Sequence, residues 1–438
     1  MKLFQQLLVA GASMSLIAPI AAQANDINLD EMNSYARRGS SSSEFDSKTF
    51  INEVNEELAT LKGRVDGLEA QQNNLEAGAF SDTTSLSGKA VFVIGAIDHP
   101  EKDSAATDGI SNESLQAQYQ YTMDLNTSFT GDDNLYVRLR TGNGEDGKEP
   151  FGETAYGGYL VSNSDKYSDS LAVDKIWYTF PVGERNTVWV GPKIENYYMH
   201  ATTPSIYKAI TKQFVLGGNA SAYGASTKTG VGWAYKADNG FAISSNIVTA
   251  GNSITGFLTD ESNTSWANQI GYTTDNYSAS LMVNLKYNGW EDSYYSTSSG
   301  HKRLNSSGGQ DANSTNYGLR GWWRPDDSGT ATPSVSVGYD FSQIDGTGLA
   351  STVDETDAWF VGLNWSDIFQ ADDKIGLAFG QPQTREDETV DPFAWEAYYS
   401  FKVNDSVTVT PAIFGGSDRK GTANEDMTGA ILETTFKF

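Results

Sequence analysis

The chain has 438 residues, 56 acidic and 30 basic side chains, a formal net charge of −26 and no cysteine. The acidic excess argues against a nucleic-acid partner, which would require a basic face, and the lack of cysteine excludes disulfide bonds and thiolate metal sites. Aromatic residues make up 12% of the chain although its mean hydropathy is −0.44, and the absence of a long apolar run after residue 24 excludes a helical membrane protein.

The N-terminus has the three parts of a cleavable signal peptide. Lys2 precedes an apolar run over residues 7–20, and the small-x-small sequence Ala22-Gln23-Ala24 follows it. The run is interrupted and falls short of the roughly 20 apolar residues that a membrane-spanning helix needs. Residues 1–24 are therefore predicted to be removed on export, with a membrane anchor or a buried helix as the alternative.

Two different segments follow. Residues 25–49 are polar and without periodicity, which predicts a flexible N-terminus of the exported protein. Residues 50–77 then show the three-and-four spacing of a coiled coil, with Glu57 and Lys62 placed to pair across parallel chains. The a and d positions are Ile51, Val54, Leu58, Leu61, Val65, Leu68 and Leu75. We predict a short oligomerising α-helix, and a single amphipathic helix packed on another domain is the alternative.

From about residue 85 to residue 438 the apolar period changes to two. Apolar and polar side chains alternate through residues 115–126, 277–287 and 395–402, so each segment has one apolar and one polar face. A closed barrel of such strands satisfies every backbone hydrogen bond within a membrane. A secreted β-sandwich would bury the apolar face as its core, and alternation alone does not exclude it.

The connections between strands favour the barrel. Short turns such as 131–134 and 238–240 alternate with longer loops such as 143–169 and 289–313, as in up-and-down barrels with periplasmic turns and extracellular loops. The predicted strands are centred on residues 92, 121, 138, 176, 190, 229, 246, 269, 282, 319, 339, 361, 378, 398, 411 and 433. The predicted fold is thus an all-β, antiparallel transmembrane β-barrel of about 16 strands over residues 85–438, preceded by a short α-helical coiled coil.

The last predicted strand indicates in which membrane the barrel lies. Leu432, Thr434, Phe436 and Phe438 share one face, and the sequence ends on Phe438. An aromatic C-terminus on an alternating strand looks like the signal that the outer-membrane assembly machinery reads. We therefore expect the barrel to lie in the outer membrane.

Three segments resemble the cyanobacterial major outer-membrane porins, also described as iron uptake porins and grouped with the carbohydrate-selective porins. They are residues 1–10 (MKLFQQLLVA), 52–70 (NEVNEELATLKGRVDGLEA) and 85–90 (SLSGKA), and the resemblance extends over essentially the whole chain. It implies a homotrimer of barrels, each preceded by a coiled-coil helix. Members of that family usually carry an S-layer-homology domain that grips the cell wall, and residues 25–49 are too few to form one, so cell-wall binding is left open.

No part of the sequence predicts catalysis. The three histidines, His99, His200 and His301, fall in predicted loops without a two-ligand helical spacing or a neighbouring nucleophile motif. No phosphate-binding glycine pattern is present either. We therefore expect no enzyme activity, no cofactor and no metal site.

The third long loop, residues 196–220, is the candidate for solute selection. By resemblance to sixteen-stranded porins it is predicted to fold inward and narrow the channel, and its segment Ser205–Val215 is compatible with a helix. The constriction residues would be Tyr197, Tyr198, His200, Tyr207, Lys208 and Lys212. An ordinary extracellular loop or a subunit contact is the alternative. The opposite wall would carry Arg138, Arg140, Arg320 and Arg324.

The sequence thus predicts an outer-membrane porin, with its N-terminal helix in the periplasm, for passive diffusion of small hydrophilic solutes. Ions and carbohydrates are the expected solutes, and iron is suggested by the resemblance alone. The expected partners are outer-membrane lipid, these solutes and further copies of the chain. Lys208 and Lys212 should govern ion preference, because low-dielectric walls focus the field of charges at a constriction. The alternative is a structural barrel that ties the outer membrane to the periplasm through the helix.

Overall fold

The structure, a computed structural model, describes part of the chain, and all of that part belongs to one compact unit, Thr83–Phe438. The described residues are 83–98, 115–144, 151, 160–162, 169–218, 223–251, 255–290, 313–326, 331–345, 355–386, 388–418, 423–424 and 426–438. The predicted signal peptide, polar N-terminus and coiled-coil helix lie outside these residues, as do His99 and His301. No helix in the described part is both long enough and apolar enough to cross a bilayer.

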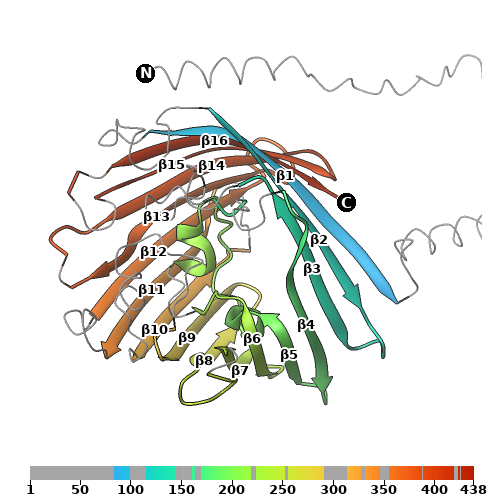
Figure 1. The fold of residues 1–438 in the computed structure, drawn as a ribbon. Helices are drawn as coiled ribbons and strands as arrows, with labels where there is room; N and C mark the ends of the chain where they lie inside the picture. The colour runs from blue at the N-terminus through green and yellow to red at the C-terminus, as the bar shows by residue number, and fades with distance from the viewer. Residues whose placement is uncertain are drawn as a thin grey trace, which may run out of the picture. The chain divides into compact units, whose positions relative to one another are not determined.

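The described residues form an antiparallel barrel of sixteen strands, each paired with its neighbours in the sequence and closed by the pairing of β1 with β16 (Figure 1). The strands are β1 Thr84–Asp98, β2 Gln116–Thr127, β3 Asn134–Gly142, β4 Ala172–Val182, β5 Asn186–Ile194, β6 Lys228–Lys236, β7 Phe241–Ala250, β8 Asn263–Thr273, β9 Tyr277–Tyr287, β10 Asn313–Trp323, β11 Ser334–Asp345, β12 Glu355–Ser366, β13 Lys374–Arg385, β14 Phe393–Asn404, β15 Val407–Ser417 and β16 Met427–Lys437. Every predicted strand centre falls inside one of them, so the predicted barrel and strand number are confirmed.

The alternation of side chains decides which face of each strand points outward. In β9, Tyr277 and Leu281 are exposed on the outside while Ser278 and Asn284 are buried on the inside. Leu281 is 39% exposed and Asn284 is fully buried. The barrel is therefore apolar outside and polar inside, as lipid around it requires, and the alternative of a β-sandwich is wrong.

One end of the barrel, the short-turn end, carries the connections of residues 128–133, 183–185, 237–240, 274–276, 324–333, 367–373 and 405–406. The predicted alternation of lengths is not strict. The connection 324–333 is longer than 386–392 at the opposite end, because β13 runs on to Arg385.

The barrel closes where Phe438 meets β1. Gly88 and Phe438 exchange two backbone hydrogen bonds, of 2.9 and 3.1 Å, and the Phe438 ring stacks on Tyr121 with centroids 5.7 Å apart. A Cβ atom at Gly88 would lie 2.5 Å from that ring. The lack of a side chain at Gly88 therefore leaves the space that the Phe438 ring occupies, and we call this space the seat of Phe438.

This seat predicts the effect of filling it. Gly88→Val should displace Phe438 and destabilise the closure by about 1–3 kcal/mol, as overpacking does. Heat-modifiable migration on unboiled gels measures the folded fraction. Ala90→Val is the matched control, because Ala90 lies on the same strand and the same face as Gly88. Equal folded fractions in the two variants would show that the seat does not matter.

Candidate functional site in the barrel lumen

The connection between β5 and β6 lies inside the ring of strands (Figure 1), and we call its residues 195–218 the inner loop. It contains two short 3-10 helices, η3 Asn196–Met199 and η4 Lys212–Gly217. Along its length it is hydrogen-bonded to inward-facing side chains of β7, β8, β11 and β14. The structure therefore seats this loop against the inner wall rather than over the outer mouth.

The first half of the inner loop is held by amide and imidazole groups. Asn196 Nδ2 donates to Asn246 Oδ1 at 2.8 Å, and Asn246 Nδ2 lies 3.0 Å from His200 Nδ1. The His200 Nε2 lies 3.2 Å from the carbonyl oxygen of Tyr223, which fits a proton on Nε2. Burial lowers the pKa of His200 to about 3. The imidazole is thus neutral at neutral pH and serves as a structural link between the loop and β7.

The second half is held by one carboxylate on β14. Glu396 is fully buried and accepts four hydrogen bonds from the inner loop. Its Oε1 accepts from the Tyr207 hydroxyl and the Ile210 backbone N–H, both at 2.9 Å. Its Oε2 accepts from the Thr211 backbone N–H at 2.8 Å and the Thr211 hydroxyl at 2.7 Å. Glu396 was not predicted to belong to the site, since one acidic residue on a polar strand face is unremarkable in sequence.

These bonds explain why most of the segment Ser205–Val215, predicted to be compatible with a helix, is not helical. Residues 205–210 are not helical, and only η4 is, with a kink at Val215. The backbone N–H groups of Ile206 and Tyr207 point to Ser336 Oγ instead of to carbonyls four residues earlier. Acceptors on the wall thus replace the intrahelical hydrogen bonds.

Glycines on the inner wall leave room for the loop. A Cβ at Gly362 of β12 would lie 2.6 Å from the Tyr207 ring, and one at Gly232 of β6 would lie 2.6 Å from the Met199 sulfur. Both positions face inward on their strands. Inward glycines opposite an aromatic-rich loop were the sequence signal that the prediction missed.

The predicted wall arginines do not form a single group. Arg320 is 3% exposed, pairs with Asp340 at 2.8 Å and donates from Nε to the Leu216 carbonyl at 2.9 Å. It therefore clamps the end of the inner loop instead of facing the channel. Arg324 is not a wall residue either, because β10 ends at Trp323 and Arg324 lies exposed over the Trp322 ring. Both departures correct the predicted placement.

Arg138 and Arg140, by contrast, lie on the inward face of β3, and Arg138 lies beside the loop. Arg138 pairs with Asp124 at 2.7 Å, and its guanidinium lies 3.4 Å from the Tyr198 hydroxyl. Tyr198 in turn contacts Tyr197, with ring centroids 4.3 Å apart. The structure thus brings two predicted loop tyrosines to one predicted wall arginine.

The two loop lysines have different environments. Lys208 is exposed to the lumen, whereas Lys212 is 1% exposed and cannot face solute. Lys208 is electrostatically coupled to Glu433, Lys437 and Lys374. Desolvation by the surrounding walls lowers the pKa of Lys208 against the opposing charge of Glu433. The prediction that both lysines face the channel is therefore corrected to Lys208 alone.

The strand register brings three more basic residues together on the inner wall. Arg140 lies opposite Thr122, Thr122 opposite Lys89, and Lys89 opposite Lys437. These inward positions of β3, β2, β1 and β16 form one continuous row. A chain of net negative charge thus carries three basic residues in one row of its inner wall.

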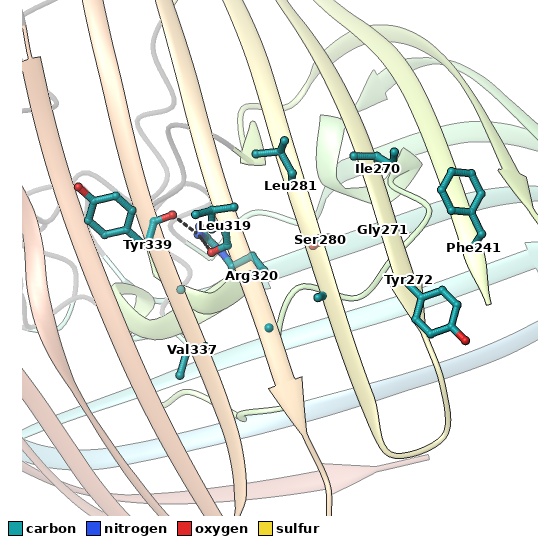
Figure 2. A pocket seen from close by; sticks show the side chains of 13 residues that line it. Phe241, Ile270, Gly271, Tyr272, Ser280, Leu281, Leu319, Arg320, Val337 and Tyr339 are labelled. Atoms are coloured by element: carbon teal, nitrogen blue, oxygen red, sulfur yellow. Dashed lines mark hydrogen bonds between the residues drawn. The ribbon is translucent and has the colours of Figure 1, made fainter. Parts of the chain in front are cut away.

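A separate groove of about 570 Å³ lies on the outer face, over β7 to β11 (Figure 2). Its lining is chiefly apolar and includes Phe241, Ile270, Tyr272, Leu281, Leu319 and Tyr339. These side chains belong to the outward faces of their strands, so the groove lies outside the lumen and is not part of the solute path.

The family model of the carbohydrate-selective porin, OprB family, matches residues 46–414. This chain belongs to the OprB family of porins. The barrel and the family together place the porin in the outer membrane, as a member of a family of solute channels.

Relatives occur in cyanobacteria. An uncharacterized protein of Nostoc sp. strain PCC 7120 is 27% identical over 88% of this porin and 71% of its own length. An uncharacterized protein of Synechocystis sp. strain PCC 6803 is 32% identical over 33% of this porin and 25% of its own length. A high-pH structure of Pseudomonas putida OprB shares the fold, with a TM-score of 0.55 at 11% identity, over 81% of this porin and 94% of that chain.

The Glu396 hydrogen bonds predict that a substitution of this residue loosens the inner loop. Glu396→Gln replaces one accepting oxygen by a donor, which should leave a loop N–H unpaired and cost about 1–3 kcal/mol locally. Amide hydrogen exchange at residues 210 and 211 should become about tenfold faster, and open-channel current noise should rise. Glu355→Gln, at an exposed position of β12, is the control. Unchanged exchange in Glu396→Gln would mean that other contacts hold the loop.

Proposed function

We propose that this porin is a passive channel for small hydrophilic solutes, narrowed by the inner loop. The observation that carries the proposal is the seating of residues 195–218 on the inner wall through buried hydrogen bonds, with Glu396 as the main acceptor. A loop held in this way occupies part of the lumen permanently. Solutes would pass between Lys208 and the row of Arg140, Lys89 and Lys437.

The charges beside the loop favour anions. The inward cations of the region include Lys89, Arg138, Arg140, Lys208, Lys374 and Lys437, and the acids near them include Asp124 and Glu433. Charges in a narrow, low-dielectric passage act on a permeating ion far more strongly than charges on loops in open water. We therefore infer that the channel prefers anions although the chain as a whole is acidic.

Carbohydrates are the second solute class that we propose. The family description names them, and Tyr198 beside Arg138 offers an aromatic face and a hydrogen-bond donor together, the combination that suits a sugar ring. We do not propose iron as a solute, because the description of the family names carbohydrates and not iron. We also propose, from the sequence alone, that the porin forms a homotrimer through the predicted heptads of residues 50–77.

Conductance in planar bilayers tests the channel itself. The purified porin should give discrete current steps, because a water-filled lumen conducts whenever the barrel is inserted. Heat-modifiable migration of the same sample shows that the barrel is folded. A folded barrel that conducts no current would contradict the proposal and favour the tether between outer membrane and periplasm.

Charge reversal at one lysine tests the basic passage. Lys208→Glu should shift the zero-current potential in a salt gradient toward cations, with the anion-to-cation permeability ratio falling roughly threefold or more. Arg185→Glu is the control, since Arg185 is exposed in the turn between β4 and β5, outside the strands that form the wall. Equal shifts in the two variants would remove Lys208 from the narrow part of the path.

A further inference from the structure

The outward faces of β7 and β8 carry a polar network halfway along both strands. Ser245 is the fifth of the ten residues of β7, Asn268 is the sixth of the eleven residues of β8, and the two lie opposite each other in the register. The Ser245 hydroxyl donates to Asn268 Oδ1 at 2.8 Å, and the Trp266 indole N–H donates to Ser245 Oγ at 3.0 Å. We call these three residues the outer polar network.

One polar atom of Asn268 takes no part in this network. The Trp266 indole N–H can only donate, so the Ser245 hydroxyl accepts from it and donates onward to the Asn268 oxygen. Among the residues that the structure describes, none accepts a hydrogen bond from Asn268 Nδ2. With the amide turned over, Oδ1 would be left without a donor in the same way. The network therefore needs one more hydrogen-bond partner on its outer side.

A second amide on the outer wall shows the contrast. Gln381 of β13 also lies beside a tryptophan, and its Oε1 accepts from the Trp359 indole N–H at 3.2 Å. Its Nε2 donates to Thr384 Oγ1 at 3.0 Å and to Asp357 Oδ2 at 3.3 Å. Both ends of the Gln381 amide are thus bound within the chain, whereas one end of the Asn268 amide points away from it.

The surroundings of Asn268 make its unbound amide end unfavourable in lipid. The neighbouring residue pairs on the same outer face are Ile243 with Ile270 and Ile247 with Trp266, all large and apolar. Positions halfway along the strands of a membrane barrel lie in the hydrocarbon, which offers no hydrogen-bond partner. Lipid headgroups lie near the strand ends and do not reach this depth. The missing partner is therefore part of another protein surface inside the membrane.

A glycine on the same side of the barrel leaves space on the outer wall. Gly321 of β10 lies opposite Ala279 of β9, and both belong to the lining of the outer groove (Figure 2). A Cβ at Gly321 would meet no atom of the described residues closer than 3.5 Å, which is ordinary contact, whereas one at Gly232 or Gly362 on the inner wall would lie 2.6 Å from its neighbour. Packing within the described part of the chain thus does not require a glycine at 321. Glycine inside a strand suits the close approach of another backbone.

A second copy of this chain supplies the missing partner at the right depth. Copies arranged around an axis along the membrane normal place the same residue of each copy at the same depth. The Asn268 amide contains both a donor and an acceptor, so Nδ2 of one copy can bind Oδ1 of the next, which has a second lone pair besides the one that Ser245 uses. A periplasmic protein would not reach a mid-strand position in the hydrocarbon.

We propose that neighbouring copies cover the outward faces of β7–β10 in the homotrimer, with the Asn268 amides hydrogen-bonded from copy to copy. The small residues Gly321 and Ala279 then let the neighbouring barrel approach closely. The proposal rests on the homotrimer proposed above from the heptads of residues 50–77, and it adds which arc of the barrel the copies share. It does not depend on which solute passes through the lumen.

Cross-linking tests the contact directly, because the chain has no cysteine of its own. Asn268→Cys, in the full chain in mild detergent with copper phenanthroline as oxidant, should form a disulfide between copies, since two Cα atoms must come within about 7 Å for this bond. Ile413→Cys is the matched control, because Ile413 is exposed on the outer face near the middle of β15. The fraction of covalent dimer on boiled, non-reducing gels should be roughly fivefold or more higher at 268 than at 413.

The outcomes of cross-linking separate this contact from the homotrimer itself. Ile270→Cys keeps the amide and gives the same measurement if Asn268→Cys associates poorly. No excess over Ile413→Cys at either position, in a chain that is trimeric without cysteine, would overturn the contact and leave the homotrimer standing. A chain that is monomeric in detergent would overturn both.

Two further substitutions test the amide and the space. Asn268→Leu and Gly321→Val should each raise the dissociation constant of the trimer in detergent roughly threefold to tenfold, because the first removes the hydrogen bonds between copies and the second fills the space between them. Ala397→Val, on the outer face of β14, is the control and should leave association unchanged. Unchanged dissociation in both test variants would overturn the proposal.

Single-channel conductance separates this contact from the channel function. The current steps of the Asn268→Leu barrel should keep their wild-type size, because Asn268 lies on the outer face and not in the lumen. Weaker association with unchanged current steps is the expected result. A changed step size with unchanged association would instead assign Asn268 a role in the solute path and overturn the proposal.

Discussion

The obligation to pair every backbone N–H and C=O group away from water governs this molecule. In a bilayer a sheet meets that obligation only if it has no edges, and here the pairing of β1 with β16 removes the last two. The same closure leaves one face of every strand in lipid and the other in a shared lumen. The low mean hydropathy of the chain follows from these two environments, because strands that alternate apolar and polar residues average to a hydrophilic sequence.

The inner loop meets the same obligation by different means. It has little secondary structure of its own, so its backbone groups bind side chains of the wall, above all Glu396 and Ser336. Arg320, buried in a pair with Asp340, donates to the carbonyl of Leu216 at the end of the loop. Polar residues on the inward faces of strands thus divide into those that hold the loop and those that meet solute, and only contacts distinguish the two groups.

That division explains what sequence predicted and what it missed. Strand positions were predictable because lipid imposes a period of two locally, on every strand. The conformation of residues 205–211 was not, because its acceptors lie on β11 and β14, more than a hundred residues further along the chain. Lys208 and Lys212 would share a face of a helix, but the observed conformation exposes one and buries the other. Arg320 was misplaced for a similar reason, since Asp340 on the next strand determines its role.

The sequence separation between Glu396 and the loop residues that it binds bears on the order in which parts of the barrel assemble. Ile210 and Glu396 are 186 residues apart, so the acceptor for the loop belongs to one of the last strands. Contacts of such high contact order form late, after the intervening chain has been organised. Until β14 is in place, the backbone of residues 210 and 211 has only water to bind. The conformation of these two residues inside the barrel is therefore fixed only once β14 has joined the sheet.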